Sequence, residues 1–104
     1  MFKIDTQHTT APEWRSKREP LFEIDGKEYT VPVEVGAEIG LRAAKIVEER
    51  GQIAGELYAI EQTIGMEAYE ALCAVEGLPK KVLSGIMSVC REKVFGGMDE
   101  EGKG

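Results

Sequence analysis

The sequence contains few of the residues that build catalytic or metal sites. Histidine occurs once, as His8, and cysteine occurs twice, as Cys73 and Cys90, among 104 residues. The two thiols are 17 positions apart with no histidine near them, so they cannot complete a structural zinc site, and both are expected to be buried. A catalytic imidazole needs a fixed partner in a sheltered site, which the polar segment around His8 does not offer. The sequence therefore predicts no catalytic, cofactor-binding or metal-binding residue.

Long hydrophobic runs and an excess of positive charge are also absent. No stretch approaches the about 20 apolar residues of a membrane span, and no apolar leader follows the N-terminus. Lysine and arginine number 13 against 19 acidic residues, for a net charge of −6, and this charge repels the phosphates of nucleic acids. We expect a non-enzymatic protein of a reducing cytoplasm that binds neither membranes nor nucleic acid.

The remaining composition is that of one small folded domain, with 42% hydrophobic and 31% charged residues. Residues 1–20 show no regular period and contain Pro12 and Pro20, so we expect a flexible N-terminal arm. Residues 21–95 form the single domain. Residues 96–104 are predicted to be a disordered acidic tail, because Gly96 and Gly97 should end the last helix.

The clearest local signal is a β-hairpin around Asp25 and Gly26. This dipeptide supplies the positive φ angles of a type I′ turn, and such a two-residue loop pairs residue 24 with 27 and residue 22 with 29. Glu23 and Glu28 then face each other on the side that meets solvent. An isolated hairpin is barely stable in water, so helices must cover the other, apolar face. That face consists of Phe22, Ile24, Tyr29 and Val31.

From residue 33 the apolar period becomes helical. A first helix is expected to end at Gly51 and a second at Gly65. A short helix over residues 66–74 then points Tyr69 and Leu72 inward, and a last helix follows Pro79. The other residues predicted to face inward are Val35, Ile39, Ala43, Ile46 and Val47 in the first helix, Ile53, Leu57, Ile60 and Ile64 in the second, and Val82, Leu83, Ile86, Val89, Cys90 and Val94 in the last. The predicted fold class is α+β, mainly α, with an N-terminal β-hairpin followed by three or four short helices.

Three bulky residues lie outside these inward-facing sets and are candidates for binding a partner. Leu41 and Phe95 lie off the apolar faces of their helices. Trp14 lies in the arm, where it either docks on its own domain or anchors a partner protein. A domain over residues 21–95 is near the size at which a single core is only marginally sufficient. The sequence therefore also favours self-association.

One ordered set of motifs runs through residues 20–95. Residues 20–32 read PLFEIDGKEYTVP, which has the form F-x-I-D-G-x-x-Y-x-x-P, and a helix with the sequence GLRAA at residues 40–44 follows. A second helix comes next, then GMEAYEAL at residues 65–72, and then a final helix. This order and length resemble those of the tail assembly chaperones of long-tailed, siphovirus-type phages of actinobacteria.

The resemblance implies a chaperone that coats the aggregation-prone tape measure protein in the host cell cytoplasm and is absent from the mature virion. The family usually has two products, of which the longer arises by a ribosomal frameshift. Gly102 and Lys103 can be encoded by GGG-AAA, a slippery run, so the chain is compatible with the shorter product. The implied partners are the tape measure protein, further copies of the chain and the longer product. The resemblance implies no catalytic residue.

Two functions of other classes remain open from the sequence. The first is a structural head–tail or tail-tube adaptor that is retained in the virion. The second is a small acidic inhibitor of a host protein. A chaperone should be missing from purified particles, whereas an inhibitor should form a stable complex with a host protein and bind no tape measure fragment.

Overall fold

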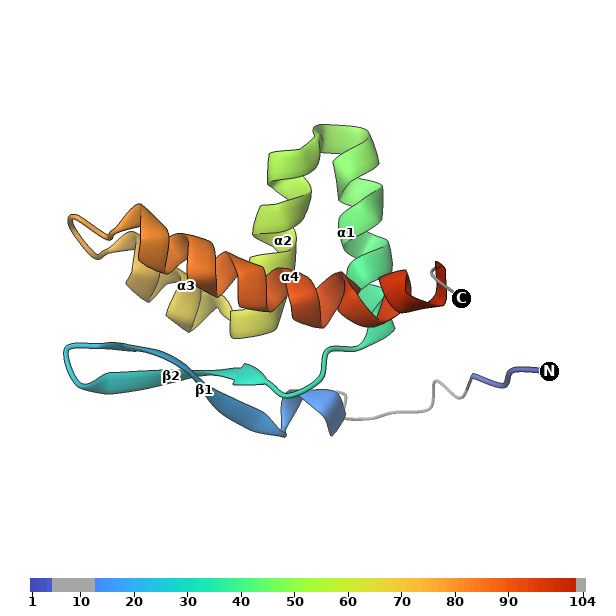
Figure 1. Cartoon of the computed structure of the whole chain (residues 1–104), viewed down its shortest axis with the longest axis horizontal. Helices are drawn as coiled ribbons and strands as arrows, with labels where there is room; N and C mark the ends of the chain where they lie inside the picture. The colour runs from blue at the N-terminus through green and yellow to red at the C-terminus, as the bar shows by residue number, and fades with distance from the viewer. Residues whose placement is uncertain (5–12, 103–104) are drawn as a thin grey trace.

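The computed structural model describes residues 1–4 and 13–102, with side chains described as far as Gly96. A short 3-10 helix precedes a two-stranded antiparallel sheet and four α-helices, which confirms the predicted α+β class. The elements are η1 (Glu13–Arg15), β1 (Arg18–Ile24), β2 (Lys27–Pro32), α1 (Ala37–Arg50), α2 (Gln52–Ile64), α3 (Met66–Cys73) and α4 (Lys80–Gly102). In Figure 1, α3 and α4 lie alongside the β-hairpin, and α1 and α2 project from the other side of α4 as a helical hairpin.

The β-hairpin has the predicted turn and register. Asp25 and Gly26 have φ angles of 49° and 86°, and the paired residues include Ile24 with Lys27, Glu23 with Glu28 and Phe22 with Tyr29. A bulge interrupts the register between Pro20 and Phe22. Leu21, the extra residue, packs against the core together with Phe22. The bulge therefore gives the hairpin an additional apolar contact that strict alternation of side chains would not predict.

The prediction of a flexible arm is wrong for residues 13–20. Strand β1 begins at Arg18 rather than at residue 21, and η1 precedes it. The Arg18 guanidinium donates to the Thr30 hydroxyl and carbonyl at 2.7 and 2.9 Å, and Arg15 donates to the Gln62 carbonyl at 3.2 Å. These long-range bonds leave no trace in the periodicity of the sequence. Residues 5–12 of the predicted arm lie outside the described residues.

Glycines end α1 and α2 as predicted and also set the spacing of the two helices. Gly51 and Gly65 have φ angles of 101° and 92°, in the region that favours glycine. Within α2, the buried Gly55 faces α1. A methyl group at Gly55 would overlap Cγ2 of Val47 and lie 3.0 Å from the Ala43 carbonyl oxygen. The absence of a side chain at this position therefore lets the two helices approach closely.

Two apolar clusters form the core. The larger joins the β-hairpin to α2, α3 and α4, and the smaller joins α1, α2 and the latter part of α4. The buried members of the larger are Val31, Ile60, Ile64, Ala68, Leu72, Ile86 and Cys90. Those of the smaller, named here the α1 cluster, are Ile39, Ala43, Ala59 and Val94. The predicted inward position of Leu72 is confirmed, and Tyr69 packs against the larger cluster.

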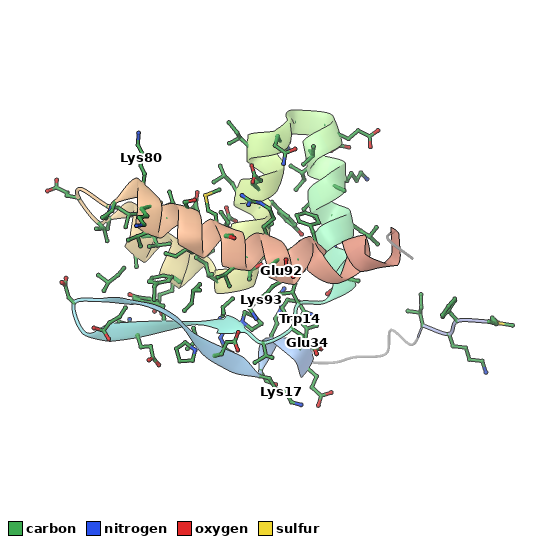
Figure 2. All side chains as sticks on the ribbon, viewed as in Figure 1. Trp14, Lys17, Glu34, Lys80, Glu92 and Lys93 are labelled. Carbon is green, nitrogen blue, oxygen red and sulfur yellow. The ribbon has the colours of Figure 1, made fainter. Side chains whose placement is uncertain are left out.

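Lys93 connects α4 to the open end of the β-hairpin, where β1 begins and β2 ends. Its Nζ atom lies 2.8 Å from Oε2 of Glu19 in β1 and donates to the Val33 carbonyl, also at 2.8 Å. Only 14% of the Lys93 side chain is exposed. Figure 2 shows Lys93 on the side of α4 that faces the sheet. This ion pair and hydrogen bond orient α4 across the start of β1 and the end of β2.

Four residues that the periodicity placed inward are exposed. They are Ile53 and Leu57 in α2, with exposed fractions of 74% and 39%, and Val82 and Val89 in α4, with 46% and 36%. For Ile53 and Leu57, Figure 1 shows the reason, because α4 crosses α2 instead of running beside it. Two crossed helices cover each other only near the crossing, and an apolar stripe that continues beyond it meets solvent.

The predicted end of the last helix is also wrong. Helix α4 continues through Gly96 and Gly97 to Gly102, so residues 96–102 of the predicted tail are helical. Glycine weakens a helix by only about 1 kcal/mol per residue and does not by itself end it. Residues 103 and 104 lie outside the described residues.

Candidate functional site

The described residues show neither a metal-holding cluster nor a buried polar side chain without a partner. Within residues 1–4 and 13–102, no group of three or more histidine, cysteine, aspartate or glutamate residues is placed to hold a metal ion. In the same part of the chain, every buried side-chain nitrogen or oxygen of a non-exposed residue has a hydrogen-bond partner. None of the helices described there is long and apolar enough to cross a membrane.

The structure places two of the three predicted partner-binding residues in the fold of the chain itself. Trp14 and Phe95 are half-buried and pack against the α1 cluster. The Trp14 indole donates to Oε2 of Glu38 at 3.2 Å, and the Arg15 guanidinium lies 4.3 Å from the centre of the Trp14 ring. Trp14 thus docks on its own domain, which was one of the two alternatives open from the sequence. Binding of a partner by Trp14 or Phe95 stays a prediction.

Leu41, the third predicted residue, lies apart from the other two. It is 67% exposed. At 100° per residue it points about 160° away from the buried residues Ile39 and Ala43 of the same helix. Leu41 therefore lies on the outer face of α1 as a single apolar side chain, which is common on protein surfaces.

One apolar line runs along α2 from the core to the surface. Ile53, Leu57, Ile60 and Ile64 fall within an arc of about 60° at 100° per residue. Ile60 and Ile64 are buried in the larger core cluster, whereas Ile53 and Leu57 continue the same line past α4. We name the exposed pair, Ile53 and Leu57, the α2 stripe. It lies on the part of the α1–α2 hairpin that projects from the domain (Figure 1).

Carboxylates lie on both sides of the α2 stripe. On the helical wheel, Glu56 is about 60° to one side of Ile53 and Glu61 is about 40° to the other side of Leu57. Oε1 of Glu56 accepts a hydrogen bond from Nη2 of Arg91 at 3.1 Å, and these atoms also form an ion pair. Glu61 is half-buried. An apolar line between two acidic positions suits a partner helix whose apolar face is bordered by lysine or arginine.

The two cysteines differ in environment. Cys90 is buried, as predicted, whereas Cys73 is exposed, so the prediction is wrong for Cys73. Burial raises the pKa of the Cys90 thiol from 9.0 to about 11, and the nearby positive charge of Lys93 opposes this rise in part. The thiol of Cys90 therefore stays protonated in the folded chain at neutral pH.

Raising the pH above 9 should destabilise the wild-type protein more than the Cys90→Ala variant. Between pH 9 and about 11 the thiol ionises in the unfolded chain but stays protonated in the folded chain. The free energy of unfolding then falls as pH rises, by up to about 3 kcal/mol at the upper end. Urea unfolding of both proteins on either side of this pH range measures the difference. An equal loss of stability in the two proteins would contradict a buried thiol.

The α2 stripe was visible in the sequence, but its exposure was not. The spacing of Ile53, Leu57, Ile60 and Ile64 predicts a narrow seam of the kind that packs against another helix. One signal for exposure was available, since Ile53 comes directly after the chain reversal at Gly51, where no further element is at hand to cover it.

Comparisons with protein-family models, with curated proteins and with solved structures found no match.

Proposed function

We propose that this chain is a non-enzymatic tail assembly chaperone that binds the tape measure protein and keeps it soluble in the host cytoplasm during tail assembly. The observation that supports this function is the α2 stripe, which carries apolar side chains out of the core onto a projecting helical hairpin. A chaperone for an extended helical client needs such a surface. The order of motifs over residues 20–95 supplies the identity of the client.

Each copy of the chain binds the client weakly. Burying a side chain such as Ile53 or Leu57 contributes about 1.5–3 kcal/mol, and the loss of rotational and translational freedom offsets much of this. Stable coating then requires several linked copies, because a second contact made by an already tethered assembly costs less freedom. Self-association is therefore part of the proposed function, together with binding of a longer frameshift product.

The client is expected to present an amphipathic helix with basic flanks. Glu56 and Glu61 border the α2 stripe, so lysine or arginine beside the client's apolar face gains a favourable contact and acidic residues there are repelled. This pattern gives the chaperone a preference among the many helices of a long tape measure protein.

Co-expression with the tape measure protein encoded by the same phage tests the proposal. That protein expressed by itself should be found in the insoluble fraction, and co-expression with this chain should move it to the soluble fraction as a complex. Recovery of the tape measure protein only in the insoluble fraction, with this chain soluble and unbound, would contradict the proposal.

Two further measurements separate a chaperone from a structural component. Mass spectrometry of purified particles should not detect the chain, whereas a head–tail or tail-tube adaptor would be present in stoichiometric amounts. Expression of an N-terminally tagged gene with its native downstream DNA should give a minor, longer product that diverges near Gly102 and Lys103. Detection of the chain in stoichiometric amounts in particles would contradict the chaperone function and favour the adaptor function.

A further inference from the structure

A second apolar surface lies at the turn end of the β-hairpin. There the hairpin, the α3–α4 connection and the first turns of α4 enclose an open groove of about 290 Å³. We name it the turn-end groove. Glu23 and Asp25 also line this groove and are exposed. Its apolar lining includes Phe22, Ile24, Leu72, Val75, Leu78 and Val82.

Among the described residues, no side chain packs on the apolar segment at the N-terminus. Residues 1–4 read Met-Phe-Lys-Ile, and Phe2 and Ile4 are 100% and 87% exposed. In Figure 1 this end of the chain points away from the domain, whereas the hairpin turn lies at the opposite end of the long axis. A single copy thus leaves both the N-terminal segment and the turn-end groove uncovered.

We propose that the N-terminal segment, Met1–Ile4, of one copy docks in the turn-end groove of a second copy. In an extended segment, alternate side chains point to the same side, so Phe2 and Ile4 enter the groove together. Lys3 then remains at the rim, on the side of the exposed Asp25 of the turn. Apolar side chains thus meet an apolar groove, and the positive charge meets the negative edge.

A second copy is the occupant because of where the two surfaces lie on one chain. The segment joins the fold at η1, before the start of β1, and the groove lies at the far end of β1. Docking between copies covers both surfaces at once and can repeat from copy to copy. This inference rests on the self-association in the proposed function, but it does not depend on the identity of the client.

Sedimentation equilibrium on the full chain tests the contact. Wild-type protein should associate, and both the Phe2→Ser/Ile4→Ser variant and the Val82→Asp variant should raise the dissociation constant at least about tenfold. Val89→Asp is the matched control, because Val89 lies on the same helix, is also partly exposed and does not line the groove. Lys3→Glu should weaken association, and adding Asp25→Asn, which suits the same turn, should restore part of it. A monomeric wild type, or loss of association only in Val89→Asp, would overturn the proposal.

Disulfide cross-linking separates docking between copies from docking within one chain. In a Cys73→Ser background, an Ile4→Cys copy and a Val82→Cys copy of different mass should form a mixed dimer after oxidation. A chain that carries both cysteines and cross-links only within itself would overturn the proposal. The turn-end variants should still bind a monovalent tape measure fragment. Loss of copy-to-copy association with retained fragment binding therefore tests the groove separately from the proposed function.

Discussion

Replacing Gly55 with alanine should lower the free energy of unfolding by about 2 kcal/mol. In an exposed helix the same change is favourable by about 1 kcal/mol, because alanine has the higher helix propensity. At Gly55, however, the added methyl group overlaps Cγ2 of Val47 and lies 3.0 Å from the Ala43 carbonyl oxygen. Backbone cannot move aside cheaply, so α1 and α2 must separate. Urea unfolding followed by circular dichroism measures the loss.

Gly85→Ala is the matched control and should change stability in the opposite direction. Gly85 lies within α4, is exposed and has no atom within 4 Å of the position that a methyl group would take. The variant should gain about 1 kcal/mol from helix propensity alone. If Gly55→Ala were as stable as Gly85→Ala, the close approach of α1 and α2 would be contradicted.

Aspartate at Ile53 and Leu57 together should weaken binding of a tape measure fragment about 100-fold. A carboxylate buried without a partner in an apolar contact costs several kcal/mol, and about 2.7 kcal/mol corresponds to this factor. Because both replaced side chains are exposed, with fractions of 74% and 39%, the thermal unfolding midpoint should change little. Titration of the labelled fragment measures the affinity.

Two single substitutions show whether the effect belongs to the α2 stripe. Met66→Asp is the control, since Met66 is 52% exposed at the start of α3 and away from the stripe, and it should bind as the wild type does. Leu41→Asp tests the residue that the sequence itself favoured, on the outer face of α1. If Leu41→Asp lost binding and the stripe variant bound normally, the contact surface would lie on α1 and not on the α2 stripe.

The β-hairpin could be predicted closely because its determinants are local. Asp25 and Gly26 adopt positive φ angles, and the two-residue turn then sets which residues pair. The ends of α1 and α2 at Gly51 and Gly65 are likewise local, since a positive φ angle favours glycine. By contrast, Gly96 lowers the stability of a helix by only about 1 kcal/mol. Packing of the rest of α4 outweighs this loss, so the glycine in the sequence did not mark the end of the helix.

The candidate site could be predicted only in part, because exposure depends on what packs on a helix. The spacing of Ile53, Leu57, Ile60 and Ile64 revealed one apolar line, but no property of that line distinguishes its buried half from its exposed half. Trp14 and Phe95 were singled out as unpaired with the core. Both pack against the α1 cluster, since η1 and the latter part of α4 reach α1.

The sequence by itself determined the turn of the β-hairpin and the ends of α1 and α2, because these depend on neighbouring residues. It also determined the acidic charge and the small number of residues able to do chemistry. Only the tertiary structure decided which apolar residues meet solvent. The crossing of α4 over α2 buries Ile60 and leaves Ile53 exposed, although both belong to the same apolar line. Burial of a side chain is a property of two surfaces, and a sequence period describes only one of them.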